Sequence, residues 1–350
     1  AEALAIISTA VATSPETGAD GYTYFDCDVP IRGEYYGSSI RKDTTNNSGN
    51  YIVKELRAPL GYYVNEEPME VTFTYDGQAI MVLDNTCSNK PTEMWVSKRD
   101  LTNDEELPGA TLAIKDTDGN TVTTWVSTDE PHRVTGLHFG ESYTLTEIRA
   151  ADGYALADNI TFRLIQKTDE GGNPLEECEV YYLTTKNILF WKWDDWRLLD
   201  DATVIMRDDI TKVQISKKDL TTKEELPGAE LTLTDEKGNE IDRWVSTDAP
   251  HYMERLPAGK YTLTEVTAPD GYAIAERVEF EVLPTGEVQT FEMFDDTNKV
   301  KISKVDITTN EELPGAELVI KDKDGNEIDR WISTNKPHYV EKIPAGEIGR

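Results

Sequence analysis

The chain has 350 residues, and its 66 Asp and Glu residues outnumber its 35 Lys and Arg residues, giving a formal net charge of −31. This charge excludes a general nucleic-acid binder and a protein held on anionic membranes, because both partners are themselves negative. With 38% hydrophobic residues the chain can form folded cores, but no apolar run reaches the ~18 residues of a membrane span.

Residues 1–90 are expected to form an incomplete β-sandwich that lacks its first strand. Their clearest strand is YIVKE, in which Glu55 shares a face with Tyr51 and Val53, because side chains alternate along a strand. A carboxylate on an otherwise apolar face is costly to bury unless it is paired or protonated. Glu55 is therefore a candidate functional residue.

Residues 91–211 carry three such charged positions, one on each of three predicted strands. The strands MWVSK, YTLTE and TVIMRD place Lys98, Glu147 and Asp208 on their apolar faces. A long insertion, NPLEECEVYYLTTKNILFWKWDDWRLLDDA, precedes the strand of Asp208. Its aromatic stretch has two interpretations, packing against the protein or binding a ligand, of which packing is preferred.

The same set recurs in residues 212–299, where VQISK, YTLTE and TFEMFD direct Lys217, Glu265 and Asp295 inward. In residues 300–350, VKISK repeats only the first of these strands, with Lys304, and the pattern breaks off before a glutamate strand. A charged residue on an apolar strand face is costly to bury, so the recurrence of Lys, Glu and Asp at these positions indicates that they have the same chemical role in each repeat. The four segments, 1–90, 91–211, 212–299 and 300–350, are called the first to fourth repeats below.

Turn sequences separate the predicted strands, among them LPGA, LPAG, DGY and the DTDGN type. Short alternating strands without a helical period indicate an all-β fold of tandem sandwiches. The DTDGN turns share aspartates with calcium loops, but Asp-Gly between strands is more typical of a hairpin, so no metal and no cofactor are predicted. Packing is expected for His132, His251 and His338, which occupy one repeat position.

These residues together resemble a known family. SKRD, LPGATLAIKD, TTWVST, YTLTE and DGYALA are similar to the Cna protein B-type domain, which is grouped with the SpaA-type pilin and prealbumin-like domains of Gram-positive surface proteins. YTLTEVTAPDGY also resembles the pilin E-box, although Ala151 replaces the proline found at Pro59 and Pro269. The resemblance covers nearly the whole chain and implies immunoglobulin-like or prealbumin-like β-sandwiches in an elongated array.

In that family an intramolecular isopeptide bond joins a first-strand lysine to a last-strand Asp or Asn, assisted by a buried Glu. The resemblance implies two such crosslinks, Lys98–Asp208 and Lys217–Asp295, with Glu147 and Glu265 as the assisting residues. By the same resemblance the first repeat keeps Glu55 and an acceptor at Asp84 or Asn85 but no lysine, and the fourth keeps Lys304 alone. The competing interpretation is a network of buried ions without a covalent bond.

The predicted function is that of a stalk segment of a cell-wall-anchored adhesin or pilin-like protein at the bacterial surface, with signal and anchor outside this sequence. The chain is expected to be monomeric within the array, to bind no nucleic acid, and to turn over no substrate, since each bond forms once. The alternative is an adhesive module that binds a host matrix protein or glycan. An enzyme is disfavoured, because the repeated carboxylates leave no second catalytic set.

Overall fold

The computed structural model describes residues 48–65, 67, 69–74, 86–188, 191–199 and 201–343. Every helix or strand assigned over these residues is a strand, β1 to β22, so the all-β prediction is confirmed. The chain divides into two compact units, of which the first comprises residues 1–99, 112–147 and 158–206, and the second residues 100–111, 148–157 and 207–350. No helix in the described part is long and apolar enough to cross a membrane.

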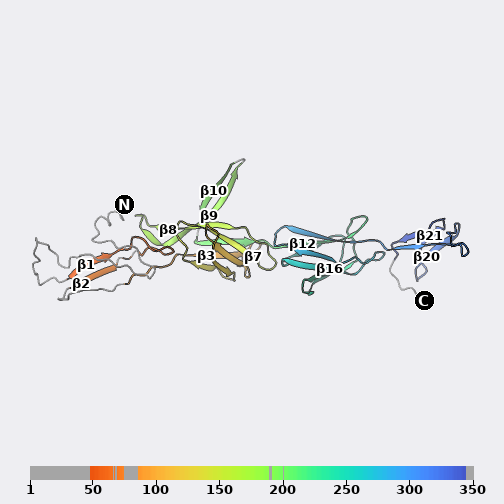
Figure 1. Ribbon diagram of the computed structural model, residues 1–350, viewed down its shortest axis with the longest axis horizontal. Helices are drawn as coiled ribbons and strands as arrows, with labels where there is room; N and C mark the ends of the chain where they lie inside the picture. The colour runs from red at the N-terminus through yellow and green to blue at the C-terminus, as the bar shows by residue number, and fades with distance from the viewer. Residues whose placement is uncertain are drawn as a thin grey trace, which may run out of the picture. The chain divides into compact units, whose positions relative to one another are not determined.

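The third repeat lies within the second unit and consists of two sheets. Its strands are β12 (Lys212–Asp219), β13 (Glu230–Asp235), β14 (Glu240–Val245), β15 (His251–Glu254), β16 (Gly259–Thr267), β17 (Val278–Val282) and β18 (Val288–Asp295). They pair in the orders β15-β12-β18 and β14-β13-β16-β17; β12 and β16, one from each sheet, are labelled in Figure 1. β12 and β18 run parallel, so the first and last strands of the repeat are direct neighbours.

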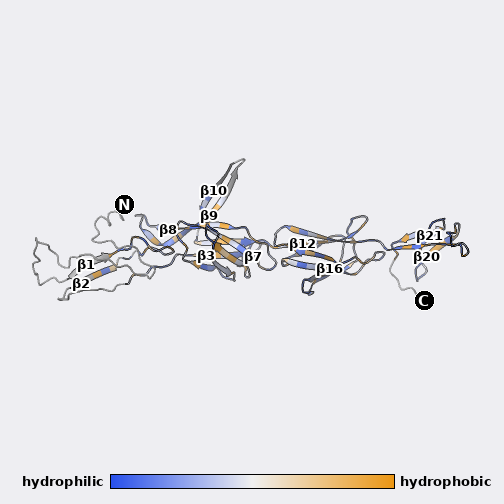
Figure 2. Cartoon of the chain, in the orientation of Figure 1, coloured by the Kyte–Doolittle hydropathy of each residue, from blue (hydrophilic) through white to orange (hydrophobic). Residues whose placement is uncertain are grey.

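One apolar core fills the space between these two sheets. Val213 and Ile215 of β12 are buried, while Gln214 between them is partly exposed, as alternation requires. Leu233 and Leu263 contribute to the same cluster from the four-stranded sheet. Hydrophobic and hydrophilic positions accordingly follow one another along the strands in Figure 2.

The turns of the DTDGN type are closed by their own first aspartates. In DEKGN this residue is Asp235, the last residue of β13, and its carboxylate accepts hydrogen bonds from the backbone and the side-chain nitrogen of Asn239, both at 2.8 Å. Gly238 takes the left-handed conformation that the turn needs, with φ of 83°. These contacts are those of a hairpin turn, as predicted.

The second repeat has the same two sheets, with one of them enlarged. Its strands are β3 (Glu93–Asp100), β4 (Thr111–Lys115), β5 (Thr121–Val126), β6 (His132–Thr135), β7 (Ser142–Arg149), β8 (Ile160–Thr168), β9 (Pro174–Ile188), β10 (Trp191–Leu198) and β11 (Thr203–Asp208). Their orders are β11-β3-β6 and β10-β9-β8-β7-β4-β5.

The insertion of the second repeat forms a long antiparallel hairpin, β9 and β10, at the edge of the larger sheet (Figure 1). The ring of Trp196 in β10 lies 4.2 Å from the guanidinium carbon of Arg163 in β8. A cation over an aromatic face is a favourable contact, so Trp196 packs within its own sheet. Phe190, which belongs to the same aromatic stretch of the insertion, lies outside the described residues.

Three shorter strand pairs complete the described chain. β1 (Ser48–Val53) pairs antiparallel with β2 (Met69–Thr74) in the first repeat. In the fourth repeat β19 (Lys299–Ile302) pairs with β22 (His338–Glu341), and β20 (Glu317–Lys321) pairs with β21 (Glu327–Ile332).

Candidate functional site

The candidate site of the third repeat starts from Lys217, in the second half of β12. Lys217 shares its strand face with Ile215 and is only 2% exposed. A buried ammonium is costly unless acidic groups accept its protons, so the strand that carries this lysine needs carboxylates close by.

Two carboxylates meet the amine, one from each sheet. Lys217 Nζ donates a hydrogen bond to Oδ1 of Asp295, at the end of the parallel neighbour β18. On its other side, Oε1 of Glu265, in β16 of the four-stranded sheet, lies 3.0 Å from the same nitrogen. Asp295 is 1% and Glu265 4% exposed, so the structure brings together all three side chains predicted for this repeat and buries them.

The surroundings shift the ionisation of the Asp295 carboxyl. Burial raises the pKa of Asp295 to about 6, and the neighbouring Lys217 opposes this rise without cancelling it. Glu265 is held by a hydrogen bond from the backbone nitrogen of Ala275 to Oε2, at 2.6 Å. An apolar pocket that favours a protonated carboxyl next to an amine provides the pair of groups from which an amide can form.

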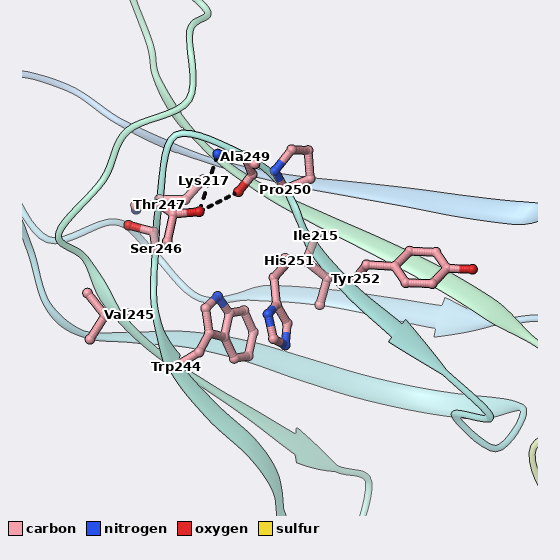
Figure 3. A pocket seen from close by; sticks show the side chains of 10 residues that line it. All are labelled: Ile215, Lys217, Trp244, Val245, Ser246, Thr247, Ala249, Pro250, His251 and Tyr252. Atoms are coloured by element: carbon pink, nitrogen blue, oxygen red, sulfur yellow. Dashed lines mark hydrogen bonds between the residues drawn. The ribbon is translucent and has the colours of Figure 1, made fainter.

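A pocket of about 110 Å³ adjoins this cluster, with Lys217 among the residues that line it (Figure 3). Its wall includes Trp244 and His251, whose rings stack at 4.3 Å, and Nε2 of His251 lies 2.8 Å from Oδ2 of Asp242. The same Trp–His stack occurs at His132 and His338, so the packing role predicted for the three histidines is confirmed.

The second repeat places its predicted residues in equivalent strands. Lys98 of β3 is 2% exposed, and its Nζ lies 3.1 Å from Oε1 of Glu147 in β7. Asp208, the last residue of β11, is 1% exposed. All three side chains are therefore buried, as strand alternation predicted.

In the first repeat, Glu55 is bound by an asparagine that the sequence analysis did not select. Asn89 Nδ2 donates to Oε2 of Glu55 at 2.6 Å, and the backbone nitrogen of Asn65 donates to the same oxygen at 2.6 Å. The predicted acceptors, Asp84 and Asn85, lie outside the described residues.

A spacing in the sequence could have identified Asn89. It stands three residues before Thr92, as Asp208 stands three before Thr211 and Asp295 three before Asn298. Thr92, Thr211 and Asn298 are themselves equivalent, because each lies six residues before the lysine position of the next repeat. Asn89 therefore occupies in the first repeat the position that Asp208 and Asp295 occupy in the second and third repeats.

Lys304 of the fourth repeat does not follow the prediction that it points inward. Its strand, β19, ends at Ile302, and Lys304 is exposed. In the described residues β19 pairs only with β22, whereas β12 has neighbours on both sides. In the described residues the fourth repeat has no counterpart of the glutamate strand β16 or of the last strand β18, so the lysine side chain stays in water, where the free energy of its charge is lower.

Comparison with known proteins identifies the domains. A family model described as SpaA, a prealbumin-like fold domain, matches residues 92–177, 211–297 and 298–348. These matches begin close to the predicted boundaries at 91, 212 and 300. No curated protein sequence matches the chain.

Several solved structures resemble it weakly. The Bacillus anthracis TIE protein is 22% identical, with 81% of this chain and 48% of that chain covered and a TM-score of 0.36. The shaft pilin spaA from Lactobacillus rhamnosus GG is 13% identical, with coverages of 59% and 97% and a TM-score of 0.25. A C-terminal fragment of the pilus adhesin SpaC from the same organism is 16% identical, with coverages of 59% and 98% and a TM-score of 0.32.

The present chain thus spans about half the length of the TIE protein, at 48%. At these identities the family assignment rests on the family model. Because its three matches together cover more than half of the sequence, the chain belongs to the family of SpaA prealbumin-like fold domains.

Proposed function

We propose that the third repeat forms a covalent isopeptide bond between Lys217 and Asp295, with Glu265 as the proton-transfer residue. The observation that carries this proposal is the position of the Lys217 amine, which is buried between the carboxyls of Glu265 and Asp295. The same reaction is proposed for Lys98 and Asp208, assisted by Glu147, because these residues occupy equivalent strands.

The reaction is a condensation without redox chemistry. The neutral amine of Lys217 attacks the carboxyl carbon of protonated Asp295, a C–N bond forms, and a C–O bond breaks. Glu265 accepts a proton from the nitrogen and delivers one to the departing hydroxyl, so one water leaves for each amide formed. The pocket beside Lys217 offers space for that water.

The fold lowers the barrier by holding the reactants in contact, which replaces a bimolecular encounter with an intramolecular one. Burial favours the neutral forms of amine and acid, because charged groups lose their hydration. The bond forms once per repeat and regenerates no catalyst. The chain is therefore proposed to be self-processing and not an enzyme with turnover.

The proposed role of the bonds is mechanical, in a stalk or spacer segment of an adhesin or pilin-like protein at the Gram-positive cell surface. β12 and β18 are the first and last strands of the repeat and run parallel. A bond from Lys217 to Asp295 passes tension directly between them, so the strands of residues 218–294 carry none of the load. Host matrix proteins or glycans would then be bound by other domains.

Intact mass under denaturing conditions tests the proposal. The folded protein should be lighter than its sequence mass by two waters, and proteolytic fragments should contain linked peptides with Lys98–Asp208 and Lys217–Asp295. A well-folded chain with the full sequence mass would contradict the reaction and leave the buried ion network as the explanation.

A further inference from the structure

Three sites in the chain repeat one backbone arrangement, which is called the joint here. Each joint combines a loop glycine after the glutamate strand of one repeat, a linker residue at the boundary with the next repeat, and a turn residue within that next repeat. The glycines are Gly61, Gly153 and Gly271; the linker residues are Thr92, Thr211 and Asn298; the turn residues are Gly136, Arg255 and Lys342. The first joint lies within the first compact unit and the other two lie within the second.

Backbone hydrogen bonds connect the three parts of each joint. In the second joint the nitrogen of Thr211 donates to the carbonyl of Gly153 at 3.0 Å, and the nitrogen of Arg255 donates to the carbonyl of Thr211 at 3.0 Å. The Thr211 hydroxyl also donates to the carbonyl of Leu256 at 2.6 Å. The first and third joints make the same two backbone hydrogen bonds. Their third contact is donated by Thr92 Oγ1 in the first joint and by Asn298 Nδ2 in the third.

The loop glycine leaves no room for a side chain. A Cβ atom on Gly153 would lie 2.6 Å from the carbonyl oxygen of Arg255, and one on Gly271 would lie 2.9 Å from Cα of Lys342. Both glycines also have positive φ, at 86° and 87°. The loop and the turn are therefore in direct backbone contact.

The turn residues themselves adopt an unusual conformation. Gly136, Arg255 and Lys342 have φ of 81°, 59° and 57°. Glycine suits this region without strain, whereas a residue with a Cβ does not. Arg and Lys at the second and third joints therefore occupy a backbone position that favours glycine, which indicates that their side chains compensate for the strain.

The Arg255 side chain reaches a tyrosine and an aspartate. Tyr154, which follows the loop glycine, donates its hydroxyl proton to Oδ2 of Asp100 at 2.8 Å. Arg255 donates to the same Oδ2 at 3.0 Å and to the Tyr154 hydroxyl, and its guanidinium carbon lies 4.9 Å from the tyrosine ring centre. The Asp100 carboxylate thus accepts hydrogen bonds from both the neutral Tyr154 hydroxyl and the Arg255 cation.

The third joint contains the same cluster with lysine in place of arginine. Tyr272 donates to Oδ2 of Asp219 at 2.6 Å, and Lys342 Nζ donates to the Tyr272 hydroxyl at 3.0 Å. The hydrogen bond from Tyr272 lowers the pKa of Asp219 to about 2, so Asp219 is anionic at neutral pH. The first joint has Gly136 at the turn position and no side chain there.

We infer that Arg255 and Lys342 are locking residues, whose cations fasten the Tyr–Asp pair of one repeat to the turn of the next. The lock is an interaction surface between successive repeats, and it does not depend on the proposed crosslinks. In this arrangement the second and third joints have a locking cation, while the first has only the backbone hydrogen bonds and the Thr92 hydroxyl contact that all three joints share in kind.

Amide hydrogen exchange of the full chain tests the lock at the second joint, with substitutions taken from the other joints. Arg255→Gly introduces the residue of the first joint, and Arg255→Lys that of the third. The amide of Thr211, which donates across the joint, should exchange roughly tenfold faster in Arg255→Gly and close to the wild-type rate in Arg255→Lys. Tyr154→Phe, which removes the shared hydroxyl, should also accelerate it.

Glycine relieves the backbone strain, so without a lock Arg255→Gly would leave the exchange of Thr211 unchanged or slow it. Either result would overturn the inference. If the Thr211 amide exchanged as fast in Arg255→Lys as in Arg255→Gly, the inference would also be overturned, because a cation at this position would then not be the locking group. The amides of Leu233 and Leu263 in the core report in the same experiment that each variant has folded.

Discussion

The third and fourth repeats begin with nearly the same sequence, ISKKDLTTKEELPGAE and ISKVDITTNEELPGAE, yet their lysines have opposite environments. Lys217 is 2% exposed and meets Glu265 and Asp295, whereas Lys304 is exposed. The local sequence is therefore not what buries the lysine. Among the described repeats, the lysine of a first strand is buried where a glutamate strand and a last strand accompany it.

Replacement of the lysine should have the largest effect at Lys217 and none at Lys304, both on the number of waters lost and on the free energy of unfolding. Lys217→Met should restore one water to the intact mass and lower the free energy of unfolding of the third repeat by about 4–5 kcal/mol, by analogy with closure of a disulfide loop of this length. The Asp295 carboxyl, which then stays free and buried, would add to this loss. Mass spectrometry and chemical denaturation measure the two effects.

Lys304→Met is the matched control. Because Lys304 is exposed, its replacement should change neither the number of waters lost nor the stability of the third repeat. A change in the number of crosslinks in this variant would show that the exposed lysine reacts after all.

Glu265 is expected to affect the rate of bond formation more than the fold. Glu265→Gln keeps the shape of the side chain but cannot transfer protons as a carboxylate does, so crosslinking should slow by roughly 10²–10⁴-fold. Relative to its own sequence mass, freshly folded Glu265→Gln protein should have lost one water fewer than the wild type. An unchanged rate would remove Glu265 from the mechanism; Glu279, an exposed residue of β17, provides the control substitution Glu279→Gln.

The pH dependence of crosslinking follows from the raised pKa of Asp295. The reactive state, neutral amine beside protonated acid, holds the same number of protons as the ion pair. As the pH falls below about 6, Asp295 takes up a proton and the pair then holds one proton more than the reactive state, so the reactive state becomes scarcer by about tenfold per pH unit. The test starts from chains that are unfolded in denaturant before they have reacted and are then refolded at different pH values. These chains should form the crosslink more slowly as the pH falls below about 6.

That measurement follows intact mass against time, with circular dichroism as the control for folding at each pH. A rate that rises as pH falls from 6 to 5 would show that the protonation step is assigned to the wrong group.

The smallest expected effect lies in the first repeat, at the acceptor position. Asn89→Asp replaces a donor to Glu55 with a second carboxyl, and the two like charges should destabilise the local structure by roughly 1–2 kcal/mol at neutral pH. Faster amide exchange at Asn65, which also binds Glu55, would report this loss. Asn89→Asp should leave the number of waters lost unchanged; exchange that stays as slow as in the wild type would contradict the role of Asn89.

Much of the third-repeat site could be predicted from its sequence, because strand alternation is a local property. The inward positions of Lys217, Glu265 and Asp295 follow from the apolar residues two places before them. The prediction for Lys304 used the same rule and was wrong, since alternation specifies a face but not what covers it. Asn89 was not predicted, because the residues before it lack the alternating apolar pattern that precedes Asp208 and Asp295.

The sequence by itself determined the all-β class, the repeats and the strand faces, all of which depend on periods of a few residues. Only the tertiary structure decided which of the buried charged side chains meet, where the insertion joins the sheet, and how Arg255 reaches Tyr154 and Asp100. Lys217 and Asp295 are 78 positions apart, and Arg255 and Asp100 are 155 apart. Such contacts arise from strand pairing and sheet packing over long sequence distances, and these are set by the burial of the whole core and not by any local pattern.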